Sequence, residues 1–421
     1  MRKSPKQWRR VLLGEIISPE RKIAVPSSGS TLPFIGMDNV ESKTGVLLST
    51  GRACEMVSAS AMVRKGDVLY GRLRPYLNKV AIASEDSYAS GEFIVFRGNE
   101  NITASFLKMR LLANDFVQYA TYLNTGDRPR VKWPQIADFS LLLPPLEEQR
   151  RIVTILEDHF ACLDAASKVL QTSHSKSDLL LNQYILKQLL GGKITADNSA
   201  LLAERPPRLP KGWKWTVLSQ VAEVVGGVAK DKKTQSDPAI PAVPYLRVAN
   251  VQRGHIDLSI IATIRVSLEK ANRLRLQKGD VLLNEGGDRD KLARGWVWEE
   301  AIKNCIHQNH VFRARPDLSC LDPYWLAWIA NTLGAPWAQA HGKQSVNLAS
   351  ISLSTIRQMP IPLPPLCEQQ AILNRINMAA GSHEQFMGYV RSVLKKIDLL
   401  RCTLLRAAFR GDLTANLRKD N

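Results

Sequence analysis

Four short segments of this chain combine arginine and lysine with glycine and polar side chains, as loops that bind a polyanion do. Two lie in the first half, at Gly71–Lys79 and Gly126–Trp133, and two in the second, at Asp288–Arg294 and Gly342–Asn347. Arginine and lysine neutralise phosphates or read guanine, while glutamine and asparagine read adenine. The candidate DNA-binding side chains are Arg72, Arg74, Lys79, Arg128, Arg130, Lys132, Arg289, Lys291, Arg294, Lys343, Gln344 and Asn347. One such loop is usually a solvated turn, but recurrence at matching places in both halves favours binding.

The overall composition also indicates a polyanionic partner. The 421 residues include 57 lysines and arginines against 39 acids, a formal net charge of +18, and such an excess is typical of proteins that bind nucleic acid. A membrane surface fits less well, because no basic amphipathic anchor or lipidation signal occurs. We expect neither a signal peptide nor a membrane span, since no 18-residue apolar run is present. Six scattered cysteines without a C-x-x-C pair fit the cytoplasm and disfavour a structural zinc site.

Signatures of catalysis are missing from the sequence. A methyltransferase or Rossmann domain needs a glycine-rich turn after a strand, whereas Val225–Val228 and Glu285–Asp288 hold only glycine pairs, for which we predict loops. Asp322-Pro323-Tyr324 lacks the second proline of the tetrad in amino-methylating enzymes, so helix capping explains it better.

Hydrolytic and metal chemistry is disfavoured as well. Glu41-Ser42-Lys43 has the E-x-K form of a nuclease, but its one nearby acid, Asp38, has no proline before it. No G-x-x-x-x-G-K-[ST] phosphate loop occurs. His307 and His310 have no evident third ligand and are better explained as hydrogen-bonded histidines. We therefore predict no catalytic, cofactor-binding or metal-binding residue on this chain.

Two long helices are predicted to position the basic loops. Leu143–Gln149 and Leu363–Gln369 share the motif Leu-Pro-Pro-Leu-x-Glu-Gln, and each opens about 40 residues without proline. Proline is accepted in a first helical turn, and Glu147 and Glu148 complement the helix dipole. Gly191-Gly192 then predicts the end of the first helix.

Both helices carry the spacing of a coiled-coil seam, in which apolar residues alternate at steps of four and three. The later helix has Ile372, Ile376, Ala379, His383, Phe386, Val390, Val393, Ile397, Leu400, Leu404 and Ala407. The earlier helix keeps the phase 220 residues before, with Ile152, Leu156, His159, Leu163, Ala166, Leu170, Ser173, Ser177, Leu180, Tyr184 and Lys187, but is polar in its centre. We expect the two helices to pair as an antiparallel coiled coil.

The sequence around the helices is an internal duplication of roughly 200 residues, too long a period for a solenoid. Trp213–Val221 matches Trp8–Ile16, Gln277–Leu282 matches Arg64–Leu69, and Val311-Phe312-Arg313 matches Val95-Phe96-Arg97. The predicted fold class is α+β, with two tandem mixed α/β domains separated by the helices. The predicted boundaries are 1–143 for the first domain, 144–192 for the first spacer helix, 193–210 for a linker, 211–362 for the second domain, and 363–421 for the second spacer helix and C-terminal tail.

Along its whole length the chain resembles the specificity subunit of type I restriction–modification systems. The resemblance is carried by the two Leu-Pro-Pro-Leu-x-Glu-Gln helix starts, the Lys-Gly-Asp-Val-Leu segments and the tandem layout. It implies two target recognition domains, each reading one half of a split, asymmetric target in double-stranded DNA. It also implies that the paired helices form a spacer and dock two modification subunits. Those methyltransferases would use S-adenosylmethionine, and separate restriction subunits would carry ATP- and Mg-dependent translocation and cleavage.

From this resemblance and the loops, we expect a non-catalytic, cytoplasmic DNA-recognition and scaffold subunit. A free-standing bipartite DNA-binding regulator is the main alternative, and it would bind DNA tightly without partners. An enzyme with unrecognised chemistry would methylate or cleave DNA unaided. A purely structural coiled-coil protein is disfavoured by the net charge of +18.

Overall fold

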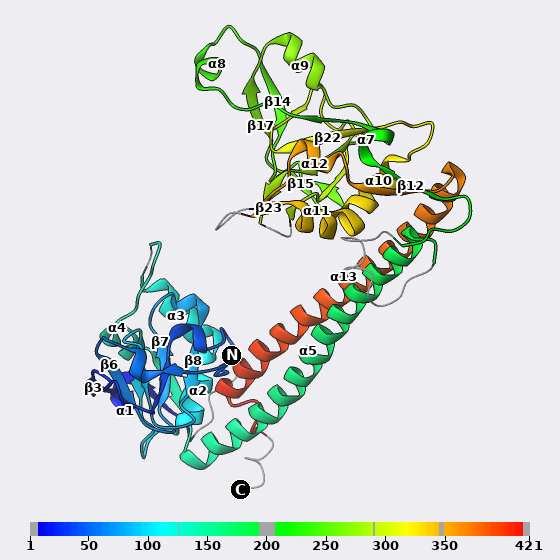
Figure 1. The fold of residues 1–421 in the computed structure, drawn as a ribbon. Coiled ribbons are helices and arrows are strands. Elements are labelled where there is room, and N and C mark those ends of the chain that lie inside the picture. Colours follow the sequence, from blue (N-terminus) through cyan, green and yellow to red (C-terminus); the bar gives the residue numbers. More distant parts are fainter. Residues whose placement is uncertain (1–6, 125, 193–206, 289–290, 345–348, 416–421) are drawn as a thin grey trace. The chain divides into compact units, whose positions relative to one another are not determined.

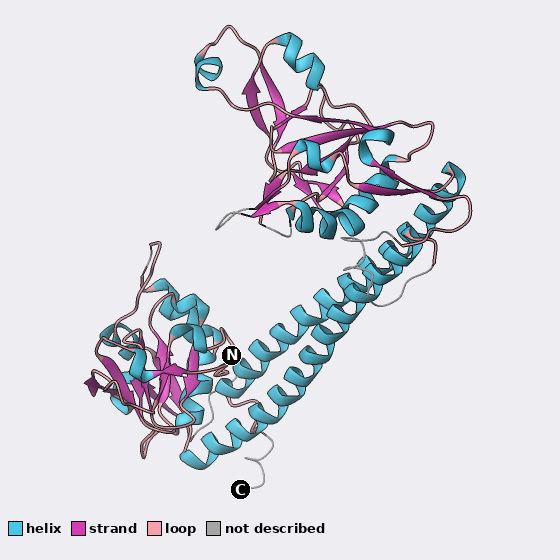
Figure 2. Ribbon diagram, in the orientation of Figure 1, coloured by secondary structure: helices cyan, strands magenta, loops and turns pink. Residues whose placement is uncertain are grey.

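The computed structural model describes residues 7–124, 126–192, 207–288, 291–344 and 349–415. It confirms the predicted class: two tandem domains of mixed helix and sheet, together with two long helices (Figures 1 and 2). The chain divides into two compact units, Met1–Thr172 with Tyr389–Asn421, and Ser173–Gly388. Each unit therefore joins one domain to a part of each long helix. No described helix is long and apolar enough to cross a membrane.

The domain of the first unit is built on two sheets. The four-stranded sheet has the order β2 (Pro19–Glu20), β10 (Phe93–Phe96), β7 (Val68–Gly71) and β8 (Val80–Ile82). The five-stranded sheet has the order β3 (Ile23–Ala24), β6 (Ser60–Val63), β9 (Ser87–Ala89), β4 (Pro33–Ile35) and β5 (Gly51–Arg52). Helices α2 (Ala104–Leu112) and α3 (Asn114–Tyr122) share a core with the four-stranded sheet, through Phe106, Phe116 and Tyr70. Finally, β1 (Arg9–Leu12) pairs with β11 (Ser140–Leu143), and short helices α1 (Leu13–Ile16) and α4 (Trp133–Ala137) flank that pair.

The domain of the second unit repeats this plan. Its four-stranded sheet has the order β13 (Ala222–Gly226), β22 (Val311–Pro316), β18 (Val281–Asn284) and β20 (Gly295–Val297). A three-stranded sheet has the order β17 (Ala262–Arg265), β14 (Ala242–Leu246) and β21 (Ile306–His307). Strand β12 (Lys214–Val217) pairs with β25 (Pro360–Leu363), and β15 (Val251–Gln252) with β16 (His255–Ile256). The helices are α7 (Leu218–Val221), α8 (Lys232–Ser236), α9 (Leu268–Leu274), α10 (Pro323–Ile329), α11 (Ala335–His341) and α12 (Leu353–Ile356), with a π-helical turn at Ala330–Gly334.

One predicted match between the halves is wrong by two residues. Gly71 lies opposite Phe93 in the first sheet, and Asn284 lies opposite Val311 in the second, so Arg97 corresponds to Arg315 and not to Arg313. The same pair of arginine–aspartate hydrogen bonds confirms that Arg97 corresponds to Arg315. Arg97 donates from Nε and Nη2 to Asp67 at 2.8 and 2.7 Å, and Arg315 donates likewise to Asp280 at 2.7 and 2.8 Å. The error arose because an even shift along a strand keeps every side chain on the same face.

Each Leu-Pro-Pro-Leu-x-Glu-Gln motif ends in a fully buried glutamine that fastens a long helix to its domain. Gln149 Oε1 accepts from the Thr103 amide at 3.0 Å, while its Nε2 donates to the carbonyls of Asn101 and Pro144 at 2.8 and 3.0 Å. Gln369 Oε1 accepts from the Asp322 amide at 2.9 Å, and its Nε2 donates to Cys320 and Pro364 at 2.8 and 2.9 Å. The glutamates one residue before these glutamines also make matching contacts in the two copies. Trp8 Nε1 donates to Glu148 at 2.8 Å, and Trp213 Nε1 to Glu368 at 2.7 Å.

Helix α5 (Leu146–Leu189) and helix α13 (Leu366–Arg410) run antiparallel within each unit. In the first unit Arg401 pairs with Asp164 and its guanidinium lies 5.1 Å from the centre of the Phe160 ring. In the second unit Arg375 Nε donates to Gln188 Oε1 at 3.0 Å. Gly191 and Gly192 have φ of +70° and +91°, which confirms the predicted stop after α5.

Half of the predicted seam is displaced by one residue. Ile376, Val390 and Ile397 are buried as expected, but Phe386 and Val393 are 38% and 39% exposed, and their neighbours Met387 and Leu394 face inward instead. On α5, too, every second predicted position is displaced by one residue. The inward-facing positions are 156, 160, 163, 167, 170, 174, 177, 181, 184 and 188 on α5, and 376, 380, 383, 387, 390, 394, 397, 401, 404 and 408 on α13. Because most heptads of α13 carry two adjacent apolar residues, two seams fitted its sequence equally well.

His383, the polar residue in the predicted seam, is matched across the helix pair. Its Nδ1 lies 2.9 Å from Ser177 Oγ, and its Nε2 lies 3.0 Å from Asp178 Oδ1. His174 lies 3.2 Å from the other oxygen of Asp178. The polar centre of α5 therefore meets the polar position of α13, and this layer disfavours a shifted pairing of the two helices.

His307 is a buried core residue on β21. Its Nδ1 donates to the Val311 carbonyl at 2.7 Å, and among the described residues its Nε2 has no hydrogen-bond partner. Burial lowers the pKa of His307 to about 4, which the hydrogen bond to Val311 only partly opposes. The imidazole is therefore neutral in the folded domain.

We predict that Gln149→Ala and Gln369→Ala each destabilise their own unit by about 2–4 kcal/mol, because each change leaves buried amide and carbonyl groups without partners. Amide hydrogen exchange gives the local measurement. Thr103 should exchange faster in the first variant and Asp322 in the second. Gln183→Ala, at an exposed position of α5, is the control. Equal exchange in all variants would rule out this anchoring role.

A second prediction concerns the pH dependence of stability. Since the folded-state pKa of His307 lies below the ordinary 6.5, its contribution is complete above about pH 6.5 and is lost as pH falls toward about 4, up to about 3 kcal/mol. His307→Gln should therefore lose less stability than the wild type between about pH 7 and about pH 4.5 in denaturant titrations. The exposed His255→Gln variant should behave like the wild type. Parallel pH profiles for His307→Gln and wild type would contradict the assignment.

Candidate nucleic-acid interface

In the first unit the structure brings the two predicted basic loops together. The Arg74 amide donates to the Pro129 carbonyl at 2.7 Å, and the Val131 amide donates to the Arg72 carbonyl at 3.0 Å. Leu73 and Arg130 form an antiparallel bridge between the same segments. Segments more than 50 residues apart in the sequence thus form one surface. We call residues 71–79 and 126–133 the first loop pair.

The cations of the first loop pair divide into two groups. Arg130 donates to Glu92 Oε1 at 2.6 Å, Arg72 Nε lies 3.7 Å from Glu92 Oε2, and Lys79 donates to the Met37 carbonyl at 2.7 Å. These three side chains therefore already have partners within the protein. The second group is Arg74, Arg128 and Lys132, which are exposed. Arg130 is exposed as well, but its guanidinium is held by Glu92.

Backbone geometry fixes the exposed Arg74. It has φ of +52°, a left-handed conformation that is uncommon outside glycine. Asn78, at the other end of the same 3₁₀ turn, has φ of +46°, and its amide group donates to the Leu112 carbonyl at 3.1 Å. The loop is therefore held in one conformation by the fold, as a recognition loop must be.

The second unit joins its basic loops by strands. Strand β24 (Ala349–Ser350) pairs on one side with β19 (Gly286–Gly287) and on the other with β23 (Lys343–Gln344). We call residues 285–294 and 342–350 the second loop pair. The predicted loop at 285–288 is thus wrong in part, because its glycines form a strand. A Cβ on Gly286 would lie 2.9 Å from the Ala349 carbonyl oxygen, so only glycine permits this approach.

Several predicted residues of the second loop pair are described. Lys343 is exposed, Arg294 is half-buried, and Lys291 pairs with Asp288, whose pKa it holds below the usual value. Strand β23 places the backbone of Gln344 beside Ala349. Arg289 and Asn347 lie outside the described residues.

Sequence reasoning missed one acidic residue at each loop pair, Glu92 beside the first and Glu285 within the second. Glu92, just before β10, accepts from Arg130 and lies near Arg72. Glu285, just after β18, has its Oε2 2.7 Å from His310 Nδ1. The sequence offered one signal for these acids, because each lies directly next to a strand of its own domain's four-stranded sheet. Position alone does not indicate a DNA contact, which is more often made by a cation or an amide.

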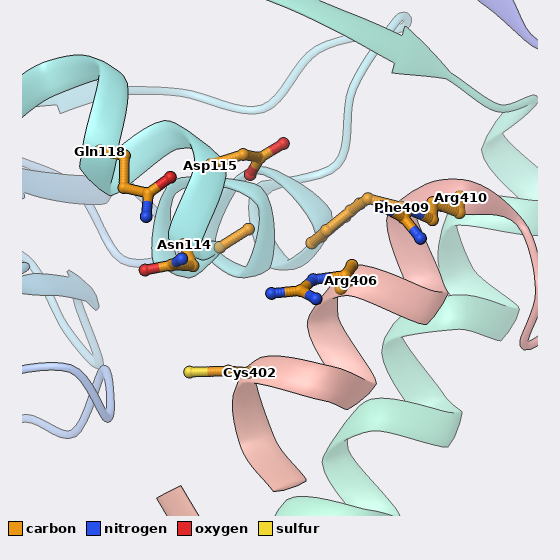
Figure 3. A pocket seen from close by; sticks show the side chains of 8 residues that line it. Asn114, Asp115, Gln118, Cys402, Arg406, Phe409 and Arg410 are labelled. Carbon is orange, nitrogen blue, oxygen red and sulfur yellow. The ribbon is translucent and has the colours of Figure 1, made fainter. Parts of the chain in front are cut away.

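A pocket of about 210 Å³ lies apart from these loops, within the first unit. It is lined by Ala113, Asn114, Asp115, Gln118, Cys402, Arg406, Phe409 and Arg410. Figure 3 shows Arg406 and Phe409 of α13 directed toward Asn114 and Asp115 of α3. Asp115 is already bonded to Arg110 at 2.7 and 2.6 Å, and the pocket contains none of the predicted DNA-binding residues. Among the described residues, no group of three or more histidines, cysteines and acids could hold a metal ion.

Comparisons with known proteins agree with this arrangement. The family described as "Type I restriction modification DNA specificity domain" matches residues 13–172 and 210–377. The specificity subunit of the type I restriction enzyme EcoBI of Escherichia coli is 23% identical over 294 residues, which cover 68% of this chain and 61% of that protein. The EcoKI specificity subunit of Escherichia coli strain K12 is 24% identical over 332 residues, covering 78% and 68%.

A solved structure has the same fold. It comes from work on complex assembly and conformational transition of the type I R-M system, and it superposes with a TM-score of 0.74 at 22% identity, covering 97% of this chain and 99% of that one. The two family matches each include one domain, one Leu-Pro-Pro-Leu-x-Glu-Gln motif and one loop pair. The chain therefore belongs to the type I restriction–modification DNA specificity family.

Proposed function

We propose that this chain is the DNA-recognition subunit of a type I restriction–modification complex, with each domain reading one half of a bipartite target. The observation that carries the proposal is the recurrence of one loop pair per domain, each formed by distant segments joined through backbone hydrogen bonds. Exposed cations on these pairs, such as Arg74, Arg128 and Lys343, provide the electrostatic attraction that DNA phosphates require.

The target is asymmetric, because the two loop pairs carry different side chains. The first presents Arg74, Arg128 and Lys132, whereas the second presents Lys343 together with Lys291 and Arg294. Side chains at the groove edge select bases, so copies that differ there read different half-sites. Two half-sites on one chain reproduce the two-fold logic of a dimeric repressor without requiring a palindrome.

The long helices scaffold the partner subunits in this proposal. Large apolar side chains on them are more than half exposed, including Val169 at 64%, Leu180 at 63%, Met378 at 76% and Tyr389 at 74%. Exposed apolar side chains gathered on one element are typical of protein interfaces. We infer that two modification subunits bind there and that restriction subunits join the same complex.

The chemistry belongs to those partners. This chain is non-catalytic in the proposal, S-adenosylmethionine is bound by the modification subunits, and ATP and Mg by the restriction subunits. The principal alternative, a regulator that acts alone, would not need the exposed apolar helix positions. Measuring DNA binding by the isolated chain and by the chain with its modification subunits separates the two functions, since the regulator would bind equally well alone.

Exposed cations of the loop pairs should contribute directly to DNA affinity. We predict that Arg74→Ala, Arg128→Ala and Lys343→Ala each weaken binding by about 1–3 kcal/mol if the residue reads a base, with less loss if it contacts phosphate. Lys270→Ala on α9, which removes the same charge from an exposed site outside the loop pairs, is the control. Fluorescence anisotropy at fixed salt gives the affinities. Unchanged binding in all three loop variants would place the interface elsewhere.

Exchange of one domain should change one half-site. Replacing residues 1–143 with the matching domain of a relative should alter one half of the methylated sequence and leave the other half intact. We expect the hybrid to make as many phosphate contacts as the wild type, so the salt dependence should change little. Mapping methylated adenines in a strain that carries the hybrid measures both halves together. A change in both halves at once would refute independent reading.

A further inference from the structure

Matching backbone hydrogen bonds align the two loop pairs residue by residue. In the first unit the Arg72 amide donates to the Glu92 carbonyl at 2.9 Å, and the Arg72 carbonyl accepts from Val131 at 3.0 Å. In the second unit the Glu285 amide donates to the His310 carbonyl at 3.0 Å, and the Glu285 carbonyl accepts from Ile351 at 2.9 Å. Arg72 therefore corresponds to Glu285, and Glu92 to His310.

This alignment shows that acid and base have exchanged places between the copies. Where the first unit has Arg72 facing Glu92, the second has Glu285 facing His310. The bridge between Leu73 and Arg130 matches the pairing of Gly286 with Ser350, so Ser350 replaces Arg130. The three positions together carry two cations and one acid in the first unit, and one acid without an arginine in the second.

Both ring nitrogens of His310 have a polar neighbour. The Asn309 side-chain nitrogen, which can only donate, lies 3.2 Å from His310 Nε2. His310 Nδ1 donates to the Glu285 carboxylate at 2.7 Å. One imidazole holds the Glu285 carboxylate, whereas Glu92 lies between two guanidinium groups.

Glu285 is fixed in position and still accessible. Its backbone is bonded on both sides, one carboxylate oxygen is held by His310, and the side chain is 27% exposed. Within the part of the chain that the structure describes, the other oxygen, Oε1, accepts no hydrogen bond. A carboxylate beside DNA is repelled by phosphate, so it is favourable there only against a hydrogen-bond donor on a base. In the major groove glutamate accepts from the amino group of cytosine.

We propose that Glu285 is a specificity-determining residue that accepts a hydrogen bond from the amino group of a cytosine in the half-site of the second domain. His310 is its positioning residue. The corresponding place in the first domain is cationic and takes no part in reading an amino group. This inference rests on the proposed function, because it requires that the second loop pair face DNA bases.

The test selects bound sequences from a random double-stranded DNA library, using the chain in complex with its modification subunits. Glu285→Gln, which is close in shape, should reduce the preference for cytosine at one position of one half-site by about tenfold or more. Glutamine pairs with adenine, so adenine should gain there. His310→Ala should weaken the same preference and no other. The exposed Glu269→Gln on α9 removes the same charge and is the control.

A double exchange gives an independent result. Glu285→Arg with His310→Glu installs the pair of the first domain, in which the glutamate holds the arginine, and should abolish the cytosine preference. If the wild-type complex selects a bipartite target but all these variants select the same one, the inference is overturned and the proposed function stands. If the wild-type complex selects no bipartite target, the proposed function itself fails. Thermal melting of each variant confirms that a changed selection comes from a folded protein.

Discussion

The architecture depends on one type of contact, the buried glutamine at the start of each long helix. Gln149 and Gln369 each satisfy a backbone amide and two backbone carbonyls, and they are fully buried. A buried amide side chain with both ends satisfied is directional, because rotation would leave donors facing donors. The prolines before it prevent the helix from starting earlier. Each helix therefore leaves its domain in a defined direction.

Much of this organisation could be predicted from the sequence, because it is encoded by local patterns. The duplication, the proline-initiated helices, the glycine stop and the two loops per copy all rest on neighbouring residues. The predicted residue positions were wrong where one sequence pattern fitted two structural arrangements. Phe386 and Met387 both suit a helix interface, and only packing decides that Met387 faces inward. Arg313 and Arg315 lie on the same face of one strand, and only the strand register and the partner Asp280 identify the equivalent of Arg97.

The interface was predicted less completely, since its acids act through partners far away in the sequence. Glu92 joins Arg72 to Arg130, 58 residues apart by their numbers. The sequence places Glu92 directly before a strand, but it does not indicate that the side chain meets Arg72 and Arg130. Glu285 and His310 are likewise brought together only by the pairing of β18 with β22. In such cases the two copies of a duplicated protein can be compared with each other. A contact that changes between the copies on an unchanged backbone marks a position where their functions have diverged.

The carboxylate of Glu148 has a consequence for chain order. One of its oxygens accepts from Trp8 at 2.8 Å and the other from Thr414 at 2.7 Å, so positions 406 residues apart by their numbers converge on one side chain. Domain, helix, domain and helix thus form a closed cycle in which neither copy has to come first. In a circular permutant, the segments beyond Trp8 and Thr414 would be joined and the chain would begin between the two copies. Its gene would encode the same cycle. An exchange of whole domains at such junctions would preserve the helix pair that carries them.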